Sequence, residues 1–171
     1  MAKSRDAKTR VGDVFEIPID DSRVGFGQII ARRMSSYLMV VFKTAHPRGV
    51  RPPVQDIVGD EPAFLAETLD AKIWNGDWPV VGNAVPNASR VPLPVYKVTI
   101  GSIDNWQVES YDGARHRPAK PWELDSLQPR TVVAAIRLQK ALQAIHGAAP
   151  WSENYRLMEY EYMRRSSGIA V

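Results

Sequence analysis

The sequence predicts an α+β domain in which a strongly bent antiparallel sheet, or a partly open small β-barrel, precedes one or two C-terminal helices. Two patterns predict this fold. Residues 12–111 hold several short segments that alternate apolar and polar side chains or form brief apolar runs, with proline, glycine and aspartate between them. From Thr131 onward, apolar residues recur every three to four positions, as in helices. We expect a disordered basic tail at 1–10 and then a single domain, β-rich over 11–128 and helical over 129–166.

The N-terminal segments give the clearest strands. Residues 13–19 alternate, the turn Asp20–Arg23 follows, and residues 24–31 alternate again with Gly25 and Gly27 on one side. The nearly continuous apolar run YLMVVFK, residues 37–43, predicts a central strand. Together these segments predict an antiparallel meander.

The middle of the chain is less regular. Residues 45–54 are rich in proline and glycine and predict a loop. The segment EPAFLAETL, residues 61–69, predicts about two turns of helix with Pro62 at its first position. The turn dipeptide Asn75-Gly76 comes before a short strand expected near 78–81.

The last third combines one hairpin with helices. Residues 95–100 and 106–111 predict two strands joined by a turn. The segment 131–147 places apolar residues on one helical face, and its stop signals are a preceding proline and a final glycine. Residues 152–165 predict a second helix with Ser152 as its N-cap.

Composition and charge narrow the functional classes. The 171 residues include no cysteine, which excludes disulfides and thiolate metal sites and fits a cytoplasmic protein. No apolar run approaches the roughly 20 residues of a membrane helix. The net charge is +3, and the N-terminal tail supplies all of it, since residues 1–10 carry four basic residues and one acidic residue. A near-neutral body argues against nucleic-acid binding, which needs many cationic contacts.

No group of residues predicts catalysis. The histidines, His46, His116 and His146, lack the spacing of a metal pair, and no serine–histidine–aspartate order is present. Gly25-x-Gly27 lacks the third glycine of a phosphate-binding loop. We therefore expect neither enzymatic activity nor a cofactor or metal.

Exposed charges suggest a protein partner instead. The first turn, with Asp20, Asp21 and Arg23, is explained by turn chemistry alone, or it forms a charged rim that faces a partner. Arg48 and Arg51 lie in a loop distant in sequence. These five residues are the predicted partner-binding residues.

Several segments, in order, resemble the immunity protein 26 family of bacterial polymorphic toxin systems. The opening GDVFEIPI (12–19) and Gly25–Gln28 resemble the family's first hairpin, and Trp78–Asn83 resembles a later W-x-x-I-G-N segment. The resemblance spans roughly residues 11–130. Departures are Ile19 in place of leucine and Phe26 in place of tyrosine. The motif residues that we expect to specify the scaffold are Gly12, Asp13, Pro18, Gly25, Phe26, Gly27, Trp78 and Gly82.

The resemblance implies a cytoplasmic protein that neutralises a toxin encoded beside it by binding the toxin. Two alternatives stay open. Gly12-Asp13-Val14 and Arg51-Pro52-Pro53 faintly resemble small β-barrel endoribonuclease toxins. A nucleic-acid-binding or small-ligand module on a similar barrel is the other.

Overall fold

The computed structural model describes residues 9–171, so most of the predicted tail lies outside the described residues. The described chain forms two compact units, and it passes from the first to the second twice along the sequence. The first unit takes the chain up to Pro86 together with Val132–Tyr160, and the second takes Asn87–Thr131 together with Glu161–Val171.

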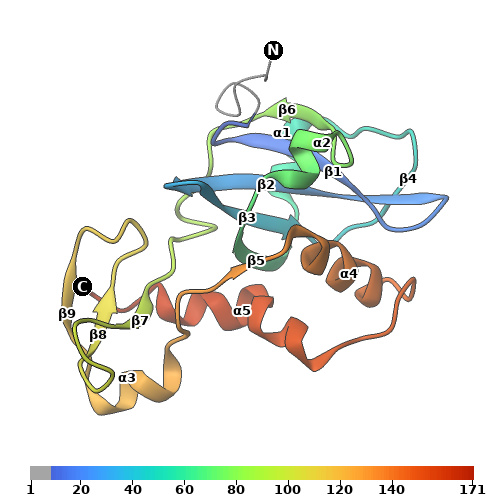
Figure 1. Ribbon diagram of the computed structural model, residues 1–171. Coiled ribbons are helices and arrows are strands. Elements are labelled where there is room, and N and C mark those ends of the chain that lie inside the picture. Colours follow the sequence, from blue (N-terminus) through green and yellow to red (C-terminus); the bar gives the residue numbers. More distant parts are fainter. Residues whose placement is uncertain (1–8) are drawn as a thin grey trace. The chain divides into compact units, whose positions relative to one another are not determined.

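Within residues 9–171, an open seven-stranded sheet forms the framework of the first unit (Figure 1). The strand order is β10-β5-β3-β2-β1-β6, and the short β4 pairs with the first residues of β2. All pairs are antiparallel except β10 with β5. The α+β class is confirmed. The strands are β1 (Asp13–Pro18), β2 (Arg23–Arg33), β3 (Ser36–Phe42), β4 (His46–Pro47), β5 (Pro62–Thr68), β6 (Val80–Asn83) and β10 (Val132–Val133).

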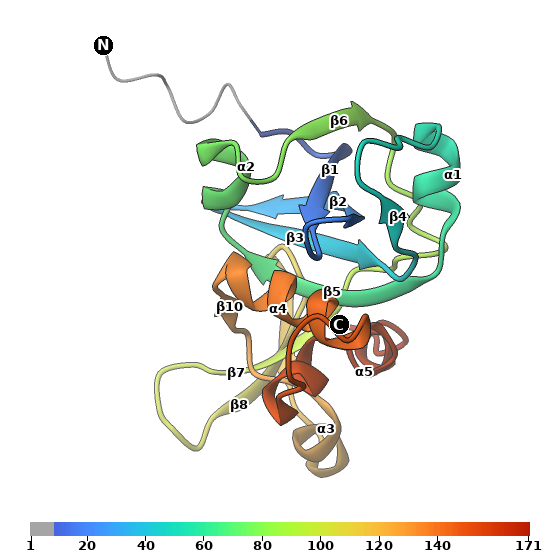
Figure 2. The ribbon, with the colours of Figure 1, turned by 90° about the vertical axis from the view of Figure 1, so that its right-hand side faces the viewer.

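The core of the first unit joins this sheet to α4 (Ala135–Ile145). Leu138 and Leu142 of α4 are fully buried and belong to the same apolar cluster as Phe15 and Trp78. Two shorter helices, α1 (Val54–Gly59) and α2 (Ala71–Asn75), lie near the two ends of β6 in Figure 2.

The helix predicted over residues 61–69 is wrong, because this segment is the strand β5. Its residues Phe64 to Thr68 are all buried, and β5 pairs with β3 from Tyr37↔Thr68 to Phe42↔Pro62. A strand covered on both faces needs a continuous apolar run, which periodicity alone does not separate from a buried helix. Pro62 fits because a proline is tolerated at the first residue of a strand.

The C-terminal helices also differ from the prediction. The first begins at Ala135 rather than Thr131, because Val132 and Val133 form β10 against β5. The second is broken at Glu159, whose backbone is extended and bridges to Phe64. The segments on either side of Glu159 are a 3-10 helix (Glu153–Met158), α5 (Tyr160–Met163) and a final 3-10 turn (Arg164–Ser166).

The second unit is a three-stranded antiparallel sheet with one short helix. The predicted hairpin is confirmed as β7 (Tyr96–Thr99) and β8 (Trp106–Glu109). A third strand, β9 (His116–Pro118), pairs with β8, and α3 is Pro121–Ser126. A small apolar cluster of Val95, Val108 and Leu127 packs with the C-terminal residues Ile169 and Val171.

An ion pair joins β9 to α3. The two terminal nitrogens of Arg117 donate to the Glu123 carboxylate at 2.8 and 2.6 Å, and the backbone N–H of Lys120 donates to it at 2.7 Å. Arg117 also donates through Nε to the carbonyl of Ala170 at 2.8 Å. The Arg117 side chain, followed by the Lys120 N–H, lowers the pKa of Glu123 to about 2. One buried carboxylate therefore ties β9 to the start of α3, and its arginine partner holds the C-terminal segment.

We predict that Gly27→Ala destabilises the first unit. A methyl group at position 27 would lie 2.6 Å from Cζ of Phe15 and 2.7 Å from the carbonyl oxygen of Val40. Overpacking of this kind costs about 1–3 kcal/mol of unfolding free energy, measurable by urea denaturation. The matched control is Gly168→Ala, which meets no atom within 4 Å. Equal stability of the two variants would contradict the packing described.

We predict that Glu123→Gln destabilises the second unit by roughly 2–3 kcal/mol at neutral pH, because it weakens the pairing of Arg117. The difference in unfolding free energy between the variant and the wild type should shrink as the pH falls from 4.5 towards 2. The unfolded carboxyl takes up its proton near pH 4.5 while the folded one stays charged, so the wild type loses this stabilisation in acid. Amide hydrogen exchange in β7–β9, followed in both proteins as a function of pH, measures this difference in stability. A pH-independent difference would show that the ion pair is not the cause.

Candidate partner-binding surface

The carboxylate of Asp20 holds the turn between β1 and β2. It accepts hydrogen bonds from the backbone N–H groups of Ser22 and Arg23 at 3.0 and 2.8 Å and from the Ser22 hydroxyl at 3.0 Å. Arg23 also donates through Nε at 2.8 Å and forms an ion pair through Nη2 at 2.6 Å. The Arg23 side chain, with the other donors, holds the pKa of Asp20 well below its usual range. These contacts fix the shape of the turn.

Arg48 connects this turn to a distant loop. Its backbone N–H donates to the carbonyl of Ser22 at 2.7 Å, which continues the pairing of β4 with β2. Its guanidinium donates through Nη2 to the carbonyl of Asp20 at 2.6 Å and through Nε to that of Asp21 at 3.0 Å. The loop after β4 and the first hairpin therefore form one continuous surface.

The C-terminal end of α4 also contacts the turn between β1 and β2. Nη2 of Arg23 donates to the carbonyl of His146 at 3.2 Å, and Nε2 of His146 lies 2.8 Å from the carbonyl of Lys43. A cation at the C-terminus of a helix is favourable because the last carbonyls carry partial negative charge. Arg23 thus supports the turn and the helix end together.

We call residues 20–23 and 46–51 the hairpin corner. Four of the five predicted residues meet there: Asp20, Asp21, Arg23 and Arg48. Arg51 is exposed in the same loop, and no contact between Arg51 and the turn is found among residues 9–171. Asp20 and Arg23 neutralise each other, so the corner offers mainly Asp21 and the two loop arginines to a partner.

A pocket borders the hairpin corner through His46. It has a volume of about 180 Å³ and is lined by His46, Thr44, Asp56, Ile57 and Asp60, among others. The ring of His46 packs edge-on against Phe26 in β2, with 5.3 Å between ring centres. This pocket could not be predicted from the sequence, because α1 supplies one of its walls and lies there only in the folded chain. The residues lining the pocket could accept a small polar side chain.

The glycines of β2 have packing roles. A Cβ at Gly25 would lie 2.7 Å from Cδ2 of Leu142 in α4, and one at Gly27 would meet the ring of Phe15. Both glycines therefore face the core, while Phe26 between them is buried on the opposite side of the strand. The close approach of neighbouring side chains explains why this strand holds two glycines beside one aromatic residue.

The other residues of the first hairpin have comparable structural contacts. Gly12 has φ +93°, a backbone conformation that favours glycine. The Asp13 carboxylate accepts a hydrogen bond from Nδ2 of Asn83 in β6 at 2.9 Å. Pro18 ends β1 opposite Val24. These contacts hold β1 between β2 and β6.

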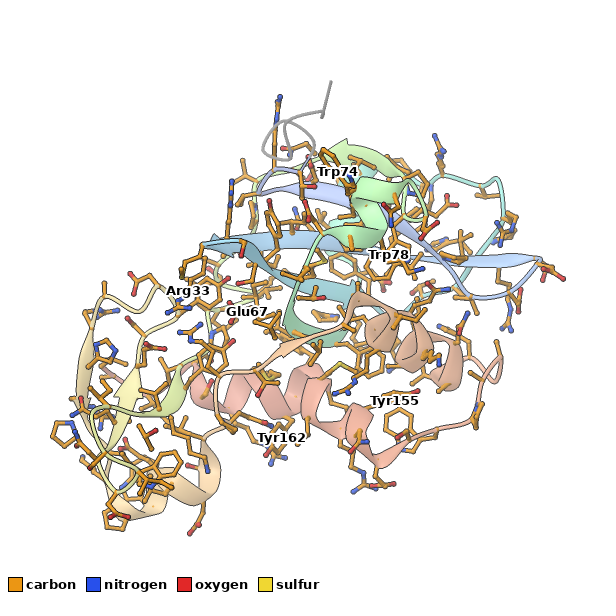
Figure 3. All side chains as sticks on the ribbon, viewed as in Figure 1. Arg33, Glu67, Trp74, Trp78, Tyr155 and Tyr162 are labelled. Atoms are coloured by element: carbon orange, nitrogen blue, oxygen red, sulfur yellow. The ribbon has the colours of Figure 1, made fainter. Side chains whose placement is uncertain are left out.

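Trp78 and Gly82 complete the motif. The indole of Trp78 (Figure 3) is fully buried, stacks on Phe15 with 5.3 Å between ring centres, and donates from Nε1 to the side-chain oxygen of Gln139 at 3.2 Å. A side chain at Gly82 would collide with Val54 of α1. In this structure the motif residues build the scaffold below the exposed corner.

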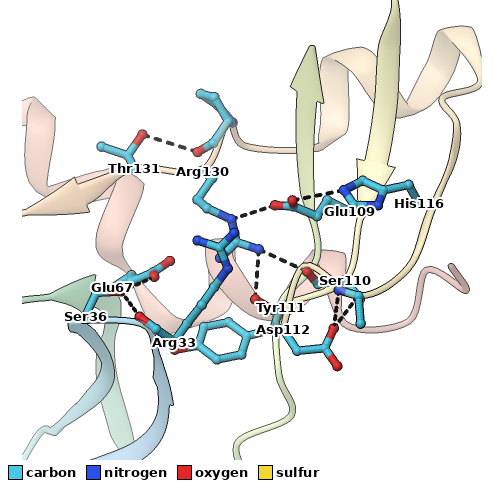
Figure 4. Close-up of polar contacts among 12 residues, drawn as sticks. Arg33, Ser36, Glu67, Glu109, Ser110, Tyr111, Asp112, His116, Arg130 and Thr131 are labelled. Atoms are coloured by element: carbon cyan, nitrogen blue, oxygen red, sulfur yellow. Dashed lines mark hydrogen bonds and ion pairs between the residues drawn. The ribbon is translucent and has the colours of Figure 1, made fainter. Parts of the chain in front are cut away.

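The second unit has its own polar network, which the sequence analysis did not identify (Figure 4). Nε of Arg130 donates to the Glu109 carboxylate at 2.7 Å, and Nε2 of His116 lies 3.1 Å from the same group. Arg130 also donates to the carbonyls of Ser110 and Tyr111 at 2.9 Å, and its guanidinium lies 4.3 Å from the ring centre of Tyr96. Pairing in β8–β9 places His116 opposite Glu109, so this cluster follows from strand register. It packs and orients the strands of the second unit.

Among the described residues, no group of three or more histidine, aspartate or glutamate side chains could hold a metal ion. Among the same residues, no helix is long and apolar enough to cross a membrane.

Comparison with known proteins gives one match. A family model described as Immunity protein 26 matches residues 10–107, more than half of the chain. The match covers the hairpin corner and all the motif residues of the first unit. No curated protein and no solved structure matched the chain.

We predict that Asp20→Ala loosens the turn. The variant removes the acceptor for the N–H groups of Ser22 and Arg23, so these two amides should exchange faster with solvent. Asp21→Ala is the matched control, since Asp21 is exposed and its carboxylate makes no hydrogen bond within the described chain. Amide exchange measured by NMR tests this, and unchanged exchange in Asp20→Ala would contradict it.

Proposed function

Because the chain belongs to the immunity protein 26 family, we propose that it is a cytoplasmic immunity protein that neutralises a cognate bacterial toxin by binding it directly. The observation that carries the proposal is the contrast between two sets of residues. The family motif residues are occupied in packing, whereas the hairpin corner is exposed and held in one shape. A surface that is ordered before binding loses less conformational entropy on association.

The charges of the corner support recognition by close contact. The carboxylates of Asp20 and Asp21 are balanced by Arg23, Arg48 and Arg51 to within one charge, so the surface has little net charge. Long-range attraction therefore contributes little to the encounter, and specificity comes from the positions of individual donors and acceptors. Toxin binding should depend only weakly on salt concentration.

Co-expression tests the function itself. The toxin encoded by the neighbouring gene should arrest growth when expressed alone and should lose this effect when the present protein is co-expressed. The two proteins should also co-purify. Toxicity that persists at high levels of the present protein would overturn the proposal.

We predict that Asp21→Arg and Arg51→Glu each weaken toxin binding by roughly tenfold, or about 1.4 kcal/mol. Both side chains are exposed, so neither variant should lower the melting temperature. Asp104→Arg reverses a charge in the exposed β7–β8 turn of the second unit and is the matched control. Calorimetric titration measures the affinities. Equal affinities in all three variants would exclude the hairpin corner as the interface.

A direct assay distinguishes toxin neutralisation from the endoribonuclease alternative. We expect the purified protein to leave RNA intact, because we propose that it acts by occupying its partner. Cleavage that depends on a single polar side chain of this chain would contradict the proposal.

A further inference from the structure

One edge of the large sheet is formed by a strand whose outer side is unpaired within residues 9–171. The sheet ends on β6, which pairs with β1 on its inner side. No residue in 9–171 pairs with its outer side. Figures 1 and 2 both show β6 at the border of the first unit. An unpaired edge presents backbone donors and acceptors that can pair with another extended chain.

The register identifies the groups that face outward. The N–H of Ala84 donates to the carbonyl of Gly12 at 3.0 Å, and Gly82 lies opposite Val14. Backbone groups alternate in direction along an antiparallel strand. The N–H of Glu16 donates to the carbonyl of Pro79 at 3.0 Å, and the register shifts at a β-bulge between Val14 and Phe15. The N–H of Val80 and the N–H and C=O groups of Asn83 therefore point away from β1.

The edge strand is short and carries a β-bulge, which are two devices that limit edge pairing, but its side chains add no further protection. Proteins commonly place lysine or proline on an edge strand, or cover it with another element. β6 reads Val-Val-Gly-Asn and carries no charged side chain. Val80 is 41% exposed and Val85, just beyond the strand, is 90% exposed. The edge has the backbone and side chains that favour strand addition.

We propose that an extended segment of the toxin pairs with the outer side of β6 and adds a strand to the sheet. This inference rests on the proposed function. Strand addition is a common mode of peptide recognition, in which main-chain hydrogen bonds supply affinity.

The small size of the edge favours the toxin, rather than a second copy of this chain, as the partner that pairs with β6. Four residues of strand bury far less than the roughly 1,200 Å² of a stable interface, so the edge must be part of a larger contact. Val80 pairs with Phe15, and Asp20 lies five residues farther along the chain, about 17 Å at roughly 3.3 Å per residue. A single partner can therefore cover both β6 and the hairpin corner.

Val80→Pro tests the edge. Proline removes the outward N–H of residue 80 and leaves the inward hydrogen bonds of Pro79 and Ala84 in place, and proline is tolerated at the first residue of a strand. The variant should keep the wild-type melting temperature and lose at least tenfold in affinity for the toxin. Val80→Ala keeps the N–H and is the matched control, for which we expect less than a threefold loss.

Amide exchange provides a second readout that needs no variant. The amides of Val80 and Asn83 should exchange at least tenfold more slowly in the toxin complex than in the free protein. Unchanged exchange, or equal affinities of Val80→Pro and Val80→Ala, would overturn strand addition while leaving toxin neutralisation intact. A wild-type protein that does not bind the toxin would overturn both. A dimer of this chain alone that Val80→Pro abolishes would assign the edge to self-association and overturn the inference.

Discussion

The packing of the first unit depends on the absence of side chains at two positions of β2. At Gly25 and Gly27 the space that a Cβ would occupy is filled by Leu142 of α4 and by the ring of Phe15. Phe15 in turn stacks on Trp78, whose indole nitrogen bonds to α4. β2 thus leaves room for three elements that are distant in sequence to pack together, namely β1, the segment before β6 and α4. Protein interiors are close-packed, so this arrangement tolerates little added volume.

Local patterns predicted the elements whose structure is decided locally. β1, β2 and β3 follow from alternation and turn residues, and α4 follows from its helical period. Local patterns do not predict the elements whose structure is decided by distant pairing. β5 is a strand because it is covered on both faces and paired with β3, and β10 exists only because β5 offers it a partner. Neither condition is visible within a short window of sequence.

The contacts of the hairpin corner also fall into local ones, which the sequence predicts, and distant ones, which it does not. The contacts of Asp20 with Ser22 and Arg23 span three residues at most, and turn chemistry anticipates them. Arg48 reaches the turn across 28 residues of chain, and the two-residue β4 that positions it is too short to leave a pattern. The same reasoning applies to the pocket beside His46. Exposed charge in the sequence pointed to five residues, of which four meet, and their relative geometry follows from the pairing of β4 with β2.

The parallel pairing of β10 with β5 has a consequence for how the chain folds as it is synthesised. β5 is complete once Thr68 has left the ribosome, but its partner begins at Val132, and the whole of 87–131 is made between them. During this interval the flank of β5 has no neighbour, and α4, which supplies Leu138 and Leu142 to the core, has yet to be translated. The nascent sheet is therefore incomplete and exposed to misassociation until β10 and α4 have been translated.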